Sequence, residues 1–204
     1  MKKQLINYCG LLGVISLISY TCAVFISPIA YPHYNAMKQA VSDLSAINAP
    51  SLKLWNILST PYNLCTLVGA TCICIGIQNL YTKRFRIGIY LFTLMEWISA
   101  LGFSMFPLTE SGYANTIQDK MHLVITGIVV ILSIISLMLI ILSHTPYLSI
   151  IAFICLMMMF IGAIGMNIVP QDYFGIVERF SVFGPVIYNA VLGLFLYHHN
   201  FIDK

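Results

Sequence analysis

Residues 121–143 read MHLVITGIVVILSIISLMLIILS and contain no Asp, Glu, Lys or Arg. A helix rises about 1.5 Å per residue, so roughly 20 such residues cross a hydrocarbon core about 30 Å thick. In that core every backbone N–H and C=O group needs an internal partner, which only helices and closed β-barrels provide. The strands of a barrel are much shorter, about 9–11 residues. The length of this block therefore predicts a transmembrane helix.

Five further apolar blocks of similar length lie on either side of it. They are 6–27, 58–80, 87–106, 147–169 and 181–198. Hydrophobic residues make up 59% of the chain and charged residues 8%, whereas soluble domains carry about 45–50% and about 25%. We therefore predict an all-α, polytopic transmembrane bundle of about six helices, forming one domain over residues 1–204. The first block is too long for a signal peptide and lacks a small-residue cleavage site, so we expect a retained helix.

The distribution of Lys and Arg predicts how these helices are oriented, because basic residues favour the cytoplasmic side. Six flank the blocks on the amino-terminal side, namely Lys2, Lys3, Lys83, Arg84, Arg86 and Lys204. Four lie on the other side, namely Lys38, Lys53, Lys120 and Arg179. We expect both termini to be cytoplasmic and the protein to lie in the cytoplasmic (inner or plasma) membrane.

The same basic residues explain the net charge of +3, so the charge does not indicate a nucleic-acid partner. Membrane lipids are the expected partners. The sequence shows no nucleotide-binding loop, haem-ligand pair or flavin motif, and we predict no cofactor. Five of the seven acidic residues fall on the side opposite the termini: Asp43, Glu110, Asp119, Asp172 and Glu178. This asymmetry is the first indication of a polar site on that side.

Between the first two blocks, residues 35–48 carry apolar side chains at helical spacing. These are Met37, Ala40, Val41, Leu44 and Ile47. Polar residues occupy the other positions, so we predict an amphipathic helix on the outer surface, acting as a lid or collar. The chain is expected to break around it at Pro28, Pro32, Pro50 and Pro61. Aromatic residues near the block ends, Tyr20 among them, are typical of an interfacial belt.

An internal repeat is visible when the third and fifth blocks are aligned. Residues 100–107 (ALGFSMFP) match residues 163–170 (AIGMNIVP), and Gly112 then matches Gly175. An acid-base pair follows each run, as Asp119-Lys120 and Glu178-Arg179. Two interpretations stay open. Either a two-helix hairpin has been duplicated, or a small residue followed by proline is simply common where helices end.

The polar residues on the outer side form the first candidate site. Asp119 and His122 are three apart at the start of one helix and so share a face. With Asp43, Glu178 and Arg179 they can form a general acid/base group, and Asn63 lies nearby. His122 with two carboxylates can also hold a divalent metal, but no HxxxH, HExxH or Cys/His spacing supports this, and we predict no metal. The alternative is that these residues cap helices at the headgroup level.

Glu96 is the second candidate, because it falls near the middle of the third block. An ionised carboxylate there costs several kcal/mol unless something compensates for it. We expect it to face inward, towards polar but uncharged neighbours. Two interpretations remain open: a proton-coupled or substrate-binding role, or a hydrogen bond between helices.

Several short motifs resemble one family. Ser42-Asp43-Leu44, Asn63 in the second block, Phe106-Pro107, His122, and residues 175–179 (GIVER) resemble the bacterial and archaeal membrane proteins called domain of unknown function 998. The resemblance covers nearly the whole chain. Thr109-Glu110 stands where the family pattern would have an aspartate. The resemblance implies a six-helix membrane protein and brings no activity with it.

Three functions are compatible with the sequence. In the first, the outer cluster binds or processes a lipid or other amphiphile, with Asp43, His122 and Glu178 as catalytic groups and Arg179, Asn63 and Asp119 as binding groups. In the second, the protein is a small proton-coupled transporter that uses Glu96. In the third, it is a structural accessory subunit of a membrane complex.

Overall fold

The computed structural model describes residues 3–78, 81–112, 114–143 and 145–198, whose regular secondary structure is helical. Its helices are α1 (Leu5–Cys9), α2 (Leu11–Ile26), α3 (Leu52–Gly76), α4 (Lys83–Met105), α5 (Ile117–Ile141), α6 (Pro146–Ile168) and α7 (Phe174–His198). Three short 3-10 helices, η1 (Ser27–Ala30), η2 (Ser42–Ser45) and η3 (Gln171–Tyr173), lie between them. Six segments are long and apolar enough to cross a membrane, with α1, α2 and η1 counted as one. The predicted six-helix membrane bundle is confirmed.

Four helices begin before the apolar block that predicted them. Helix α3 begins at Leu52, α4 at Lys83, α5 at Ile117 and α7 at Phe174. The first turns of α4 and α5 are polar or charged, and such a turn stays hydrated at the membrane surface without disturbing the backbone hydrogen bonds of the helix. Those of α3 and α7 are mostly apolar and are preceded by loop residues. Hydropathy therefore located the spans but not their ends.

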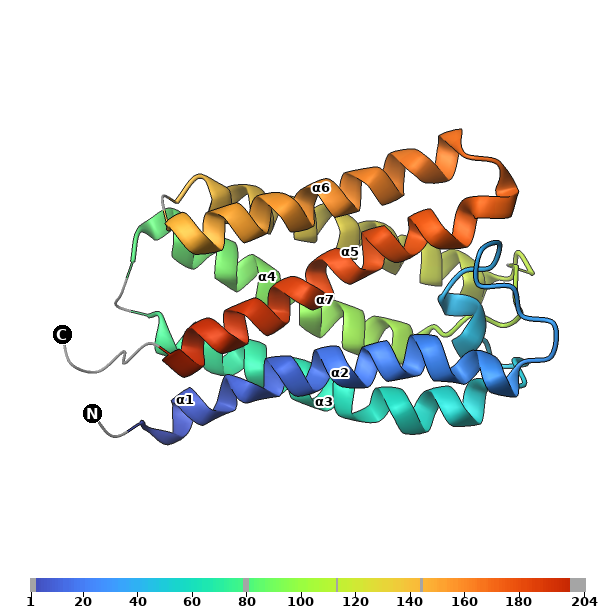
Figure 1. Ribbon diagram of the computed structural model, residues 1–204, viewed down its shortest axis with the longest axis horizontal. Coiled ribbons are helices and arrows are strands. Elements are labelled where there is room, and N and C mark those ends of the chain that lie inside the picture. The colour runs from blue at the N-terminus through green and yellow to red at the C-terminus, as the bar shows by residue number, and fades with distance from the viewer. Residues whose placement is uncertain (1–2, 79–80, 113, 144, 199–204) are drawn as a thin grey trace.

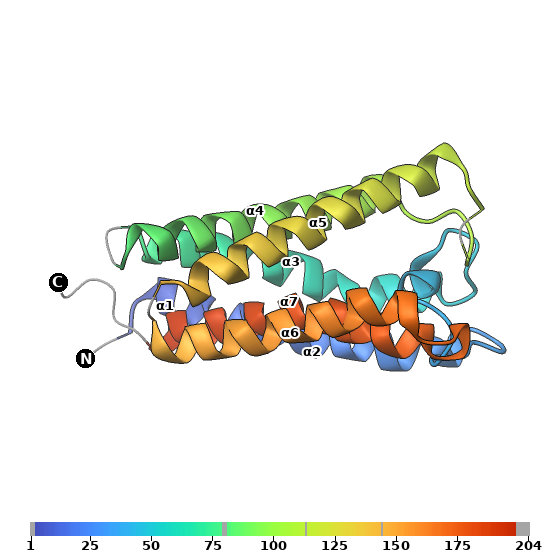
Figure 2. The ribbon, with the colours of Figure 1, turned by 90° about the horizontal axis from the view of Figure 1, so that it is seen from above.

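The two ends of the bundle differ (Figure 1). At one end, here the terminal end, lie α1, the last turns of α7 and the described residues between α3 and α4 and between α5 and α6 (77, 78, 81, 82, 142, 143 and 145). At the other, the loop end, lie the longer segments 27–51, 106–116 and 169–173. Figure 2 shows that the α4–α5 pair lies close to α6 and α7 near the terminal end and diverges from them towards the loop end. We use terminal half and loop half for the two corresponding parts of the bundle.

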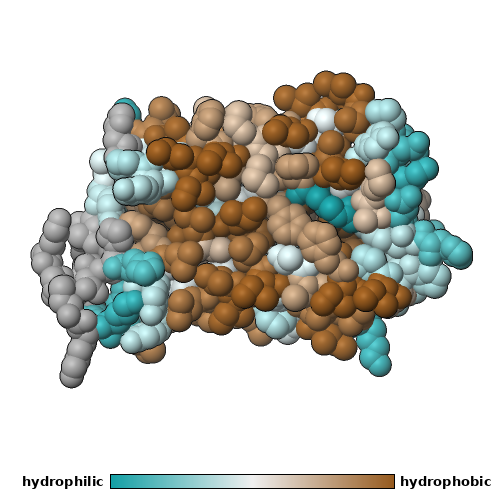
Figure 3. Space-filling view, viewed as in Figure 1, coloured by the Kyte–Doolittle hydropathy of each residue, from teal (hydrophilic) through white to brown (hydrophobic). Residues whose placement is uncertain are grey.

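The main apolar core lies in the terminal half. Most of its largest fully buried side chains come from the first half of α4, the last halves of α3, α5 and α7, and the residue after α3: Ile73, Ile77, Phe85, Ile89, Phe92, Leu137, Ile140 and Tyr188. Two more, Met95 and Met159, lie just beyond the midpoints of α4 and α6. Outside this core the surface is an apolar band between hydrophilic ends (Figure 3). The band is the surface expected to face lipid.

Glycines allow α1 and α2 to approach α7 closely. A Cβ atom at Gly193 would overlap the carbonyl oxygen of Gly10, and it would lie 3.2 Å from the Cα atom of Gly13. Small residues at such a crossing let two backbones pack in contact, which drives much helix association in lipid. The terminal half is thus held by apolar side chains and by direct backbone packing.

The predicted amphipathic helix over residues 35–48 is wrong. Only Ser42–Ser45 are helical there, as the 3-10 helix η2, and the rest is turns. The apolar spacing has another cause: Val41 and Leu44 are buried against the bundle. Distant groups take the backbone hydrogen bonds, because the Ile47 N–H donates to the Leu108 carbonyl (2.8 Å) and the Met37 carbonyl accepts from the Gly175 N–H (2.8 Å).

The two aligned hairpins, α4–α5 and α6–α7, are both present, but their matched glycines differ. Gly112 lies in a turn with a φ of 80°, where a residue with a side chain would be strained. Gly175 lies inside α7, where a Cβ would overlap the carbonyl of Gln39. Duplication of a hairpin therefore stays a prediction.

Candidate functional site

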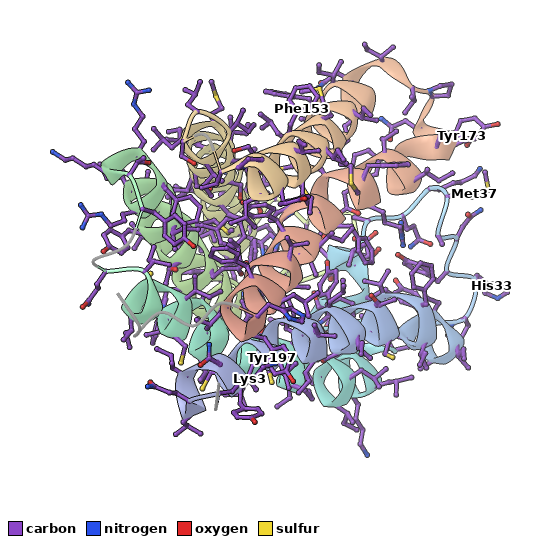
Figure 4. All side chains as sticks on the ribbon, turned by 60° about the vertical axis from the view of Figure 1, so that its left-hand side comes forward. Lys3, His33, Met37, Phe153, Tyr173 and Tyr197 are labelled. Atoms are coloured by element: carbon purple, nitrogen blue, oxygen red, sulfur yellow. The ribbon has the colours of Figure 1, made fainter. Side chains whose placement is uncertain are left out.

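Residues 27–51 close the loop end of the bundle, and we call this segment the cap. Figure 4 shows His33 and Met37 of the cap at the loop end, with Tyr173 beside Met37, whereas Lys3 and Tyr197 lie at the terminal end. Arg179 of α7 holds the cap in place. Its Nη1 donates to the carbonyls of Ala36 (2.7 Å) and Gln39 (3.1 Å), and its Nη2 donates to the Tyr34 hydroxyl (2.7 Å).

The two carboxylates nearest Arg179 also bind backbone. Glu178 Oε2 accepts from the Val41 N–H (2.9 Å), and Asp43 Oδ1 accepts from the Gly112 N–H (3.1 Å). The Asp43 side chain is 4% exposed, and it interacts electrostatically with Glu178. Asp43, Glu178 and Arg179 therefore do come together, as the sequence predicted. Each of them fastens the cap to a neighbouring segment.

Tyr34 completes this cluster. Its hydroxyl accepts from Arg179 and donates to the Ala40 carbonyl (2.8 Å). Burial raises the pKa of Tyr34 to about 12, although the nearby Arg179 acts in the opposite direction. The hydroxyl therefore stays protonated at neutral pH and can make both hydrogen bonds. The sequence analysis did not single out Tyr34, because no local pattern pairs a loop tyrosine with an arginine far along the chain.

Asp119 lies on α5 and is fully buried. Its carboxylate accepts from the Thr109 N–H (2.8 Å), the Thr109 hydroxyl (2.9 Å) and the Thr116 N–H (3.2 Å). Thr116 in turn accepts from the Asp119 N–H, which completes a capping box at the start of α5. Asp119 thus caps a helix and also binds Thr109, two residues after Phe106-Pro107.

His122 lies three residues further along α5 and is 6% exposed. Its Nδ1 is 2.8 Å from the Phe106 carbonyl oxygen. A carbonyl oxygen can only accept, so Nδ1 carries the proton of this hydrogen bond. The ring also packs against Phe103, with centroids 4.7 Å apart. Among the described residues no three His, Cys, Asp or Glu side chains are grouped so as to hold a metal ion.

Asn63 is exposed on α3 and does not join either group. It follows Pro61, which we had expected to break the chain but which lies inside α3. Ser19 of α2 compensates for the missing backbone hydrogen bonds of that turn, since its hydroxyl donates to the Leu58 carbonyl and accepts from the Tyr62 N–H (2.9 Å). The proline is thereby tolerated, and Tyr62 is fixed within the bundle.

Glu96 lies near the middle of α4 and is 3% exposed. It faces inward, as predicted. Among the described residues, no group donates a hydrogen bond to its carboxyl group or accepts one from it. It does interact electrostatically with Tyr62 of α3. Nearby on α3, Thr66 is also buried, and its hydroxyl has no hydrogen-bond partner in the described part of the chain.

Tyr20 interacts both with Tyr62 of α3 and with the charged residues at the loop end of the bundle. It is buried in a small apolar cluster with Val24, Val41 and Val186, so its predicted place in an interfacial belt is wrong. Its ring centroid lies 4.8 Å from that of Tyr62, and it interacts electrostatically with Glu178 and Arg179. A tyrosine within an apolar block fits a lipid-facing or a buried position equally well, so no sequence pattern distinguishes the two.

One comparison with known proteins gives a match. A family model described as "Protein of unknown function (DUF998)" matches residues 14–194. No curated protein matches the chain, and no solved structure does.

Proposed function

The chain belongs to the DUF998 family of proteins of unknown function, and from its geometry we propose that it is a small transporter whose substrate or proton binds at Glu96. The observation that carries this proposal is the buried, unpaired carboxyl group in the middle of a membrane span. Buried polar groups in proteins nearly always have a hydrogen-bond partner, and an exception needs an explanation. An ionisable residue inside a span indicates a functional site by default.

The packing of the bundle is compatible with a change of access at this site. In the loop halves of α4 and α5, Met95, next to the midpoint of α4, and Ile125 are the only buried apolar side chains among the described residues. In the terminal half the same two helices contribute Phe85, Phe92 and Leu137 to the main core. The α4–α5 hairpin can therefore tilt about its terminal half, which would open and close the path between Glu96 and the loop end.

We further propose that the terminal end is cytoplasmic. Lys3, Lys83, Arg84 and Arg86 lie there, whereas the acidic residues other than Glu96 in the described part of the chain lie at the loop end. Single cysteines at Ser111 and at Lys83 would test this with a membrane-impermeant maleimide on intact cells. Labelling of the first position alone is expected, and labelling of the second alone would reverse the orientation.

The transport proposal can be tested without knowing the substrate. Metabolites and lipids would be compared, inside cells and in the medium, for cells that lack the protein and cells that express wild type, Glu96→Gln or Glu96→Asp. Wild type should redistribute at least one small molecule between cells and medium, and Glu96→Gln should not, because the amide cannot ionise. A redistribution that survives Glu96→Gln at equal protein level would exclude the proposal.

A second candidate function rests on His122. Its Nδ1–H bond to Phe106 fixes the imidazole ring, as is common for histidines that act in catalysis. In this interpretation the protein processes a lipid or other amphiphile at the loop end. The same experiment separates the two functions, because processing would change the covalent structure of a lipid and would be lost in His122→Ala.

A further inference from the structure

The groups around Glu96 specify what kind of ligand can bind there. The first observation is that two buried oxygen-bearing side chains on adjacent helices lack partners among the described residues. They are the Thr66 hydroxyl on α3, which is 1% exposed and a buried atom without a hydrogen-bond partner, and the Glu96 carboxyl group on α4, whose residue is 3% exposed and forms no hydrogen bond or ion pair with the described residues. A single orphaned group can be a local defect of packing. Two of them at one depth indicate a place where a ligand supplies the missing partner.

The register between α3 and α4 places these two groups at the same depth. The Thr93 hydroxyl donates to the Ala70 carbonyl (3.2 Å), and the two helices run antiparallel. Three residues further along α4 is Glu96, and four residues back along α3 is Thr66. Tyr62, one more turn back, faces the same way as Thr66 and interacts electrostatically with Glu96.

The second observation concerns charge. Glu96 has no basic partner in the described part of the chain. Tyr20, whose ring packs against that of Tyr62, interacts electrostatically with Arg179. The guanidinium of Arg179 is bonded to three carbonyls, those of Ala36, Gln39 and Gly175, and to one hydroxyl. The site therefore offers one acid and hydroxyl oxygens, and Arg179 is already bonded to the cap and to the Gly175 carbonyl of α7.

The third observation concerns the aromatic side chains of Tyr62 and Tyr20. Tyr62, which interacts electrostatically with Glu96, packs its ring against the Tyr20 ring, with centroids 4.8 Å apart and planes inclined at 48°. The faces of aromatic rings attract cations, most strongly where water is excluded. An acid together with tyrosine rings is the usual chemistry of sites that bind ammonium groups carrying apolar substituents.

We infer that the ligand at Glu96 is an organic cation, such as a protonated or quaternary amine with apolar substituents, held by the Glu96 carboxylate and the rings of Tyr62 and Tyr20. This inference rests on the proposed transport function and names its substrate class. An organic anion would meet a carboxylate with no cation free to bind it. A sugar would need many more hydrogen-bonding groups, and a metal ion would need further ligands, which the described residues do not group there.

Two ions of the same shape and opposite charge test this inference. Tetraphenylphosphonium and tetraphenylborate would each be measured alone, by equilibrium binding to the purified full-length chain in nanodiscs, with empty nanodiscs as background. Saturable binding of the phosphonium is expected at one site per chain, and the borate should show background binding only. Equal binding of both ions, or background binding of the phosphonium, would overturn the cation assignment.

Variants identify the groups responsible. Glu96→Gln should weaken phosphonium binding at least about tenfold, because a charge-assisted contact is lost. Tyr62→Leu should weaken it roughly tenfold, whereas Tyr62→Phe, which keeps the ring, should stay within about threefold of wild type. Tyr90→Leu removes an exposed tyrosine from the terminal half of α4 and serves as the matched control.

The outcomes for the two proposals are distinguishable. If Glu96→Gln stops redistribution of a metabolite in cells while tetraphenylphosphonium fails to bind wild type, the transporter stands and the cation class falls. If tetraphenylphosphonium binds wild type and Glu96→Gln equally, binding does not involve Glu96 and the inference is wrong. Binding that depends on Glu96 and on the Tyr62 ring supports it.

Discussion

The two halves of this bundle bury different kinds of polar side chain. In the terminal half these groups are short side chains bonded to nearby carbonyls: Asn7 donates to Leu196 (2.9 Å), Ser136 to Ser133 (2.9 Å) and Ser143 to Ile140. In the loop half and at the midpoint ionisable groups are buried as well, beside hydroxyls such as those of Ser51 and Thr66. The buried acids and the buried histidine of the described chain lie there: Asp43, Glu96, Asp119 and His122.

From this contrast we infer that the terminal half provides stability and that the loop half and Glu96 provide function. A closely packed apolar half is rigid even though Asn189 Oδ1 has no hydrogen-bond partner there among the described residues, and it can hold the helices in place whatever the loop half does. Ionisable groups are costly to bury, and a small protein can tolerate them where another part supplies the stability. We expect substitutions in the terminal half to act on folding, those in the cap to act on local order, and those at Glu96 to act on transport alone.

Gly193→Leu should have the largest effect on stability. Its side chain would overlap the Gly10 backbone, so α1 and α2 would have to move away from α7. We expect a loss of about 4 kcal/mol or more, as for other severe overpacking, and little monodisperse protein in detergent. The measurement is thermal unfolding followed by size-exclusion chromatography.

The control for this change lies in the loop half of α5. A Cβ atom at Gly127 would meet nothing within 4 Å, so Gly127→Ala should change stability by no more than about 0.5 kcal/mol. If Gly193→Leu were as harmless as Gly127→Ala, the terminal half would not be the rigid part of the molecule.

Arg179→Ala should have the next largest effect. It removes the hydrogen bonds that attach the cap to α7, and hydrogen bonds from a charged donor contribute about 1.5–3 kcal/mol in total at such a site. Hydrogen exchange at the Val41 and Gly175 amides should accelerate, while exchange in the terminal half stays unchanged.

Lys38→Ala is the matched control for the cap. Lys38 pairs with Asp172 at 2.8 Å, but both side chains are more than half exposed. Such surface pairs contribute about 0–1 kcal/mol, so exchange in the cap should hardly change. Equal effects of the two variants would show that Arg179 has no special part in holding the cap.

Asp119→Ala should cost about 1–2 kcal/mol, because it removes the capping box of α5 and leaves the Thr109 and Thr116 amides without their acceptor. Glu110→Ala, at an exposed position of the same connection, is the control and should be neutral. Thermal unfolding of both variants measures the difference. A neutral Asp119→Ala would mean that the carboxylate serves a purpose other than capping.

The sequence predicted some of these features for clear physical reasons. Six spans follow from hydropathy, because each is longer than the hydrocarbon core is thick. The capping alternative for Asp119 was visible as well, since Thr116 precedes it by three residues. Inward-facing Glu96 followed from the cost of placing a carboxylate in lipid.

The cap and the tyrosines could not be predicted from local sequence. Residues 35–48 have helical apolar spacing, yet the carboxylate and carbonyl groups that fix their backbone come from Glu178 and Leu108. Such contacts join positions far apart in the chain, and no periodicity reports them. Tyr62 is placed by a serine of another helix that compensates for Pro61, which a single span cannot reveal.

Glu96→Gln should have the smallest effect on stability and the clearest effect on function. The amide has nearly the same shape as the carboxyl group, and it removes a potential charge from the middle of the membrane, so stability should stay within about 0.5 kcal/mol or rise. Thermal unfolding should therefore match wild type, whereas redistribution of the substrate in cells should be lost. Glu96→Asp, which keeps the acid on a shorter side chain, is the control and should retain part of the activity. If Glu96→Gln instead lowers the amount of folded protein as much as the activity, the carboxyl group is a structural element of the bundle. The division between a half that provides stability and a half that provides function would then fail at the residue on which it depends most.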